Sequence, residues 1–153
     1  MAHPASSNAL PTAPPPGVQP RIIELPVRFS DIDGMGHVNN VVYLTYTEEA
    51  RSQWANKDLG VESLEKFSFI LAHAAIDFLA PVDFGADVRV AMWVPRIGGK
   101  SWDFGYAISD VHSGALYATA RTTQVAYDYK TRSTVSIPKP WLAHLQKLAP
   151  KSS

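Results

Sequence analysis

The chain has 153 residues, about the size of a single domain. It carries 14 Lys and Arg against 14 Asp and Glu, so its formal net charge is zero. A neutral chain lacks the positive charge with which proteins attract nucleic acids and anionic membranes, so we expect neither as a partner. The chain has no cysteine, which excludes disulfides, cysteine-bound metals and thiol nucleophiles and fits a cytoplasmic location.

Residues 1–20 differ in composition from the rest of the chain. They hold six of the twelve prolines and no Lys, Arg, Asp or Glu. Proline removes a backbone donor and biases the preceding residue toward extended geometry, so this stretch forms neither a helix nor a central strand. We interpret it as a disordered proline-rich tail, and we place one folded domain at residues 21–150.

The first predicted elements of the domain are a strand, a loop and a long helix. Residues 22–29 alternate between apolar and polar and predict the strand, and residues 30–39 predict the loop. Residues 40–55 have helical spacing, and Asn39 or Asn40 is the expected N-cap. The apolar face of this helix consists of Tyr43, Tyr46, Ala50 and Trp54.

Four runs rich in Val, Ala and aromatic residues follow the helix. They predict strands over residues 69–81, 87–97, 101–110 and 116–128. The links between the runs are short, and a parallel crossover needs about a dozen residues, so each link predicts antiparallel neighbours. Pro140 opens a terminal helix. Its apolar side consists of Trp141, Leu145 and Leu148. The order of elements predicts an α+β domain in which an antiparallel sheet packs on one long helix.

Residues 28–40 carry the side chains that could take part in catalysis. They read Arg-Phe-Ser-Asp-Ile-Asp-Gly-Met-Gly-His-Val-Asn-Asn and lead directly into the long helix. The first turn of a helix has unpaired N–H groups and a partial positive charge, which can stabilise an oxyanion. A carboxylate just upstream, such as that of Asp33, can act as base or nucleophile in acyl transfer. From the residues alone, a helix cap or a turn explains the same pattern.

The run from Asp31 to Arg51 follows the pattern D-x-D-x-x-G-H-V-N-N-x-x-Y-x-x-Y-x-E-x-A-R. In this pattern the chain resembles the 4-hydroxybenzoyl-CoA thioesterase family of hot-dog-fold acyl-CoA thioesterases, and its H-V-N-N-x-x-Y core also resembles the plant acyl-ACP thioesterases. Later segments extend the likeness over residues 24–140. The resemblance implies a hot-dog fold, with a five- to six-stranded antiparallel sheet wrapped around the central helix. It also implies two subunits that share one continuous sheet, with active sites at their interface.

The resemblance implies roles for four residues of the motif. Asp33 matches the catalytic aspartate, which acts as nucleophile or as base for water, and the backbone N–H at about Asn40 matches the donor to the thioester carbonyl. His37 matches a histidine with a catalytic role in the plant enzymes, and Glu48 matches a recurrent helix glutamate. The alternatives are ordinary loop and helix-start chemistry for His37 and Asn40, and a surface pair with Arg51 for Glu48.

Coenzyme A is a polyanion, so a neutral protein that binds it must gather positive charge locally. Arg96, Lys100 and Arg132 are the candidates for contacts to phosphate, and Ser101 can bond a phosphate or the pantetheine group. Tyr43 can line the pocket for the acyl group. The histidines have no metal-ligand spacing, so we expect no metal, and no cofactor beyond the coenzyme A of the substrate.

Together these features predict a thioester hydrolase of lipid metabolism that converts acyl-CoA to free acid and CoA. We expect a homodimer or a dimer-of-dimers tetramer. Hydrolysis of acyl-ACP is the alternative reaction. A non-catalytic acyl-CoA-binding protein is the alternative class, although a binder has no need of a carboxylate at Asp33. A structural interaction domain that works through its proline-rich tail is the third alternative.

Overall fold

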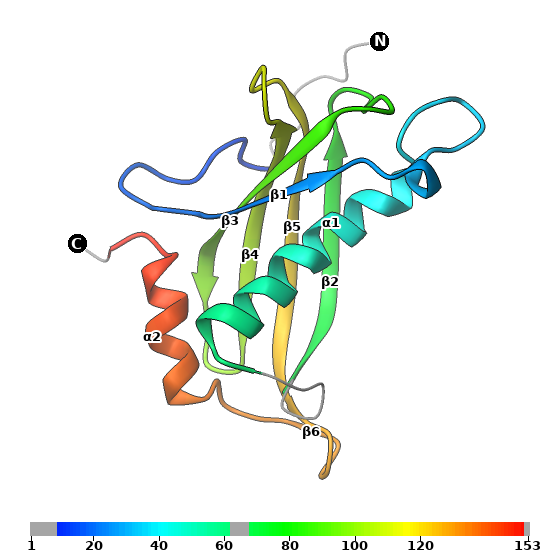
Figure 1. Ribbon diagram of the computed structural model, residues 1–153. Coiled ribbons are helices and arrows are strands. Elements are labelled where there is room, and N and C mark those ends of the chain that lie inside the picture. The colour runs from blue at the N-terminus through cyan, green and yellow to red at the C-terminus, as the bar shows by residue number, and fades with distance from the viewer. Residues whose placement is uncertain (1–8, 62–67, 152–153) are drawn as a thin grey trace.

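The structure, a computed structural model, describes residues 9–61 and 68–151 (Figure 1). Its elements in chain order are β1 (Arg21–Pro26), a 3-10 turn (Phe29–Asp31), α1 (Asn40–Gln53), a π-helical turn (Trp54–Asp58), β2 (Phe69–Phe78), β3 (Asp87–Ile97), β4 (Ser101–Asp110), β5 (Leu116–Asp128), β6 (Ser133–Thr134) and α2 (Lys139–Lys147).

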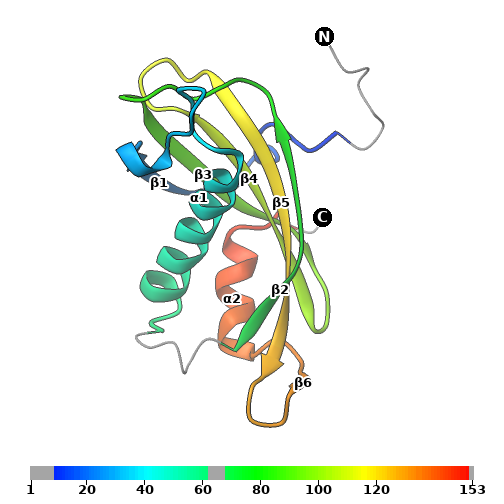
Figure 2. The same ribbon diagram turned by 90° about the vertical axis from the view of Figure 1, so that its right-hand side faces the viewer.

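The strands form one antiparallel six-stranded sheet in the order β1-β3-β4-β5-β2, and the short β6 pairs with the end of β5. The sheet curls around α1, which crosses its concave side (Figures 1 and 2). The helix α2 packs near the end of β3, where the backbone N–H of Val94 donates to the carbonyl of Leu148 at 2.8 Å. This is the predicted α+β architecture, with one long helix laid across an antiparallel sheet.

The core lies between α1 and the concave side of the sheet. The four predicted helix positions, from Tyr43 to Trp54, are all buried, which confirms the helical spacing. Alternate residues of β4 face them, because successive side chains of a strand point to opposite sides of the sheet. These residues are Trp102, Phe104, Tyr106 and Ile108. The ring of Trp54 meets Phe104 edge to face at 5.2 Å between centres, so aromatic packing fixes the helix on the sheet.

The bounds of β3, β4 and β5 are those predicted, but other elements differ. The first strand ends at Pro26 because the backbone N–H of Arg28 donates to the Asp31 carboxylate at 2.8 Å and turns the chain. The helix α1 ends at Gln53 and continues as a π-helical turn, and β2 stops at Phe78. The two-residue β6 was not predicted.

The prediction that the link after β2 joins antiparallel neighbours is wrong. The strand β2 pairs with β5, whereas β3 lies between β1 and β4, three positions away across the sheet. Residues 79–86 form the link. Eight extended residues reach about 26–29 Å, more than the roughly 14 Å across three strand spacings. A link can therefore be too short for a helical crossover and still pass over two strands.

Residues 9–20 of the predicted tail lie against the outer side of the sheet. Val18 is buried against Trp93 and Ala107, which point away from α1. The backbone N–H of Leu10 donates to a carboxylate oxygen of Asp77 at 3.3 Å. The division into tail and domain at residue 20 remains a prediction. No helix of the described residues has both the length and the apolar character needed to cross a membrane.

Candidate active site

A small hairpin precedes α1 and carries the predicted catalytic residues. Ile32 and Val38 form an antiparallel bridge, and the backbone N–H of Asp33 donates to the carbonyl of His37 at 2.9 Å. The turn between them uses Gly36 with φ of 82°, a conformation that L side chains rarely adopt. The glycine of the motif therefore lets the loop fold back on itself directly before the helix.

The two aspartates of the motif have different environments. Asp31 is 2% exposed, and its carboxylate accepts hydrogen bonds from the guanidinium of Arg28 at 3.0 Å, so it fixes the loop. Asp33 is half-buried, and its Oδ1 accepts from the backbone N–H of Met35 at 2.9 Å. Its Oδ2 makes no hydrogen bond within the described part of the chain. Asp33 is thus the carboxylate with an oxygen free to react.

The start of α1 leaves one backbone donor without a partner. Asn39 is the N-cap, as predicted, and its Oδ1 accepts from the backbone N–H of Val41 at 3.0 Å. The N–H of Val42 donates to the carbonyl of Asn39 at 2.9 Å. The N–H of Asn40 has no acceptor among the described residues. It is therefore the donor of the first turn that remains available to a ligand.

Asp33, His37, Asn40 and Tyr43 line one cavity of about 410 Å³. Its remaining walls are mostly apolar and come from the loop, from the end of β2 and from the segment that follows β2. They consist of Met35, Val38, Phe78, Leu79, Ala80 and Pro81. The ring of Tyr43 packs edge to face on Phe78 at 5.0 Å between centres. Burial raises the pKa of Tyr43, so this wall carries no charge at neutral pH.

The structure does not bring Glu48 to this cavity. Glu48 is exposed on α1 and does not line the cavity. Its alternative partner, Arg51, instead turns into the core, where Nη1 donates to Thr47 Oγ1 and Tyr106 Oη, both at 3.1 Å. Within the described residues of one chain, Glu48 therefore neither lines the cavity nor pairs with Arg51.

The predicted coenzyme-binding residues lie at the opposite end of the sheet from the cavity. The strand β3 begins near the cavity at Asp87 and extends over 11 residues to the turn that contains Lys100. Arg96 donates to Ser101 Oγ at 2.9 Å beside this turn. The turn between β5 and β6 lies at the same end of the sheet (Figure 1), and Arg132, an exposed residue, belongs to this turn. One chain alone therefore does not join these residues to Asp33.

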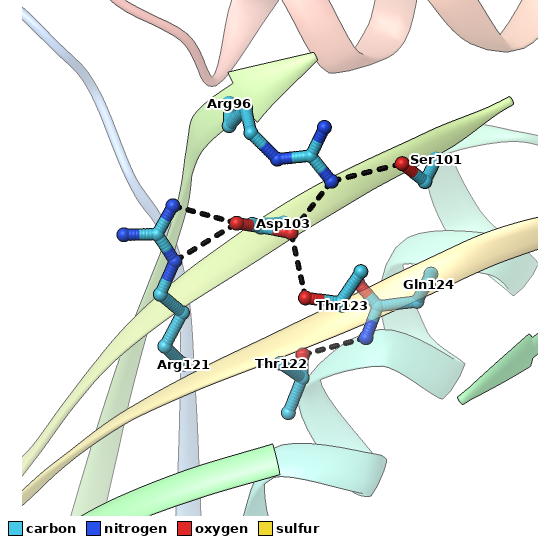
Figure 3. A network of polar contacts seen from close by, with 7 residues as sticks. All are labelled: Arg96, Ser101, Asp103, Arg121, Thr122, Thr123 and Gln124. Carbon is cyan, nitrogen blue, oxygen red and sulfur yellow. Dashed lines mark hydrogen bonds and ion pairs between the residues drawn. The ribbon is translucent and has the colours of Figure 1, made fainter. Parts of the chain in front are cut away.

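Sequence reasoning missed a polar network centred on Asp103, on the outer side of the sheet (Figure 3). The Asp103 carboxylate accepts from Arg121 Nη2 at 2.6 Å, Arg96 Nη2 at 3.0 Å and Thr123 Oγ1 at 2.8 Å. Burial alone would raise the pKa of Asp103, but these hydrogen bonds outweigh it and hold the pKa below its usual range. The network depends on the strand register, which places Asp103 of β4 opposite Thr123 of β5.

Within the residues that the structure describes, no three His, Asp or Glu side chains gather in a way that could hold a metal ion. The residues that line the cavity supply a carboxylate, an imidazole and a helix N-terminus.

Comparisons with known proteins agree with this architecture. The family described as the thioesterase-like superfamily matches residues 27–145. The long-chain acyl-CoA thioesterase FadM of Escherichia coli is 27% identical over 122 residues, which cover 74% of this chain and 88% of that protein.

Solved structures extend the likeness to the fold. A 1,4-dihydroxy-2-naphthoyl-CoA thioesterase from Synechocystis is 28% identical with a TM-score of 0.74, and the match covers 83% of this chain and 96% of that one. A thioesterase from Thermus thermophilus, crystallised with coenzyme A and zinc, is 26% identical with a TM-score of 0.74, covering 83% and 92%. The predicted hot-dog fold and family resemblance are confirmed: this chain belongs to the thioesterase-like superfamily.

Proposed function

We propose that this protein hydrolyses acyl-CoA thioesters to the free acid and CoA, with Asp33 and the start of α1 as its catalytic groups. One observation carries the proposal. A single cavity is lined by Asp33 and Asn40, and within the described residues the Asp33 Oδ2 makes no hydrogen bond and the Asn40 N–H has no acceptor. The family and the names of its relatives make the chain a thioester hydrolase, and the relative from Escherichia coli is named for acyl-CoA.

The two groups act on opposite sides of the thioester carbonyl. The N–H of Asn40 and the dipole of α1 stabilise the oxyanion that develops on the carbonyl oxygen. Asp33 Oδ2 either takes a proton from the attacking water or attacks the carbonyl carbon itself and forms an anhydride that water then opens. In both routes the carbon–sulfur bond breaks and CoA leaves as its thiol. The geometry of one chain suits either route.

The free edge of β2 supports a homodimer. This strand has ten residues, and within the described part of the chain it pairs with β5 alone. Natural sheets protect their edges with short strands, charges or proline. The other edge, β1, has six residues and contains Arg21, Glu24 and Pro26. The strand β2 has no lysine or proline, and Leu71 on it is 47% exposed. We therefore place the partner copy on β2.

A two-fold pairing along β2 also brings basic residues to the cavity. A two-fold axis makes the two β2 strands antiparallel, so the Phe69 end of one copy lies beside the Phe78 end of the other. Phe69 lies next to the turn after β5, because its carbonyl accepts from the Tyr129 hydroxyl at 3.2 Å. That turn contains Lys130 and Arg132. In the dimer each copy thus supplies positive charge for the coenzyme bound at its partner.

A thioester panel tests the proposal. The purified protein is offered acyl-CoA and acyl-ACP substrates of different chain lengths, and free thiol is followed. We expect turnover of acyl-CoA and a loss of about 10²–10⁴ in kcat for Asp33→Asn. Asp110→Asn is the matched control, because Asp110 Oδ2 accepts from the N–H two residues on, at 3.0 Å, as Asp33 Oδ1 does, but Asp110 ends β4 and does not line the cavity.

The outcomes separate the alternatives. If the protein binds acyl-CoA but hydrolyses no thioester, it is a binding protein. If it hydrolyses acyl-ACP alone, then acyl-ACP and not acyl-CoA is its substrate. Activity that survives in Asp33→Asn would remove Asp33 from the mechanism. Light scattering should give at least twice the 16.8 kDa of one chain, and a monomer would contradict the proposed dimer.

A further inference from the structure

Asp83 reaches the proposed active site from a distant part of the chain. It lies in the link between β2 and β3, and its Oδ1 lies 3.5 Å from Nε2 of His37. His37 lines the cavity together with Asp33, whereas Asp83 contacts the imidazole without lining the cavity. The sequence motif around Asp33 does not include this carboxylate.

Backbone hydrogen bonds hold the two residues in place. His37 and Asp83 form an antiparallel bridge, and the N–H of Val38 donates to the carbonyl of Val82 at 2.9 Å. On the other side, the carbonyl of His37 accepts from the N–H of Asp33. The pairing of two loops therefore holds the Asp83 carboxylate beside Nε2 of His37, at a cavity that His37 and Asp33 both line.

We propose that Asp83 is a positioning residue for His37, an inference that rests on the proposed thioester hydrolysis. A carboxylate accepts hydrogen bonds only, so it favours the tautomer of neutral His37 that carries its proton on Nε2. Nδ1 is then the nitrogen with a free lone pair. It accepts a hydrogen bond from the water whose other proton passes to Asp33, and this orients the water for attack.

Imidazole NMR tests the tautomer directly. Long-range ¹H–¹⁵N spectra recorded where the ring is neutral should show His37 with its proton on Nε2, and the signals that vanish in His37→Gln identify it. In Asp83→Ala the two tautomers should mix. We expect kcat to fall about two- to fivefold, the range that an exposed ion pair allows, with little change in KM. Asp83→Glu keeps the carboxylate and should restore kcat.

Asp87→Ala is the matched control. Asp87 Oδ2 lies 3.1 Å from Nε2 of His112, a second exposed histidine–carboxylate pair that does not line the cavity. Its loss should change the signals of His112 and leave kcat unaltered. An unchanged His37 tautomer and unchanged kcat in Asp83→Ala would overturn the inference, even if Asp33→Asn is inactive and the proposed function stands. If the wild type hydrolyses no thioester, the proposed function fails, and the catalytic part of this inference fails with it.

Discussion

Replacing Asn40 with proline would remove one backbone N–H and leave the fold nearly unchanged. Asn40 is the first residue of α1, a position at which proline is favoured because its fixed φ suits the helix. Proline requires an extended residue before it, and Asn39 has φ of −61° and ψ of 140°. The N–H that is lost has no acceptor among the described residues. We therefore expect the free energy of unfolding to change by less than about 1 kcal/mol.

The same substitution should be severe for catalysis. If the Asn40 N–H stabilises the oxyanion, its removal takes away one preorganised donor. Loss of one such donor typically lowers kcat about 10²–10³-fold, or about 2.7–4 kcal/mol of transition-state stabilisation. The variant would thus separate stability from activity, because the donor that serves the reaction has no role in holding the helix.

Free-thiol release and thermal unfolding, measured on the same preparations, check this prediction. Asn40→Ala is the comparison, since it keeps the N–H and removes only an exposed side chain, and its kcat should stay within a few-fold of wild type. A folded Asn40→Pro protein that turns over as fast as Asn40→Ala would refute the assignment of this N–H as the oxyanion donor.

Two further predictions concern stability. Asp103→Asn should lower the free energy of unfolding at neutral pH by about 1–2 kcal/mol, less than for a fully buried pair because the side chains of Arg96 and Arg121 are 41% and 38% exposed. Folding lowers the pKa of Asp103, so this stabilisation is complete above about pH 4 and is lost as the pH falls further. Urea unfolding of wild type and Asp103→Asn at a series of pH values should show that their difference in free energy of unfolding vanishes in acid. Deleting residues 1–20 should uncover Trp93, which is 1% exposed beside Val18, and shift tryptophan emission to longer wavelength, while turnover and assembly persist.

Local patterns predicted the elements well, whereas the pairing of strands needed information that the patterns lack. The bounds of β3, β4 and β5 follow from alternation between short turns. The place of β2 beside β5 depends on curvature of the whole sheet, which no short window of sequence contains. The shift from α-helix to π-helix at Trp54 likewise depends on packing in the core.

The candidate site likewise combines residues that one sequence motif contains with residues that only the fold brings near them. Asp33, His37, Asn40 and Tyr43 lie within eleven consecutive residues, so one motif found them all. Asp83 joins them only through the bridge between two loops, and no local signal marks it. Charge alone marks the basic candidates, and charge does not indicate which end of a strand lies at the cavity.

The end of β2 connects assembly with catalysis. Phe78 is the last residue of β2, and it lines the cavity together with Leu79. Their exposed fractions are 50% for Phe78 and 52% for Leu79. Exposed apolar side chains beside an unpaired strand edge are costly in water and become favourable when a second strand covers them. If the partner pairs along β2, the event that protects this edge also closes the apolar wall opposite Asp33. Exclusion of water strengthens electrostatic interactions inside a cavity, so the same pairing would favour the proposed reaction.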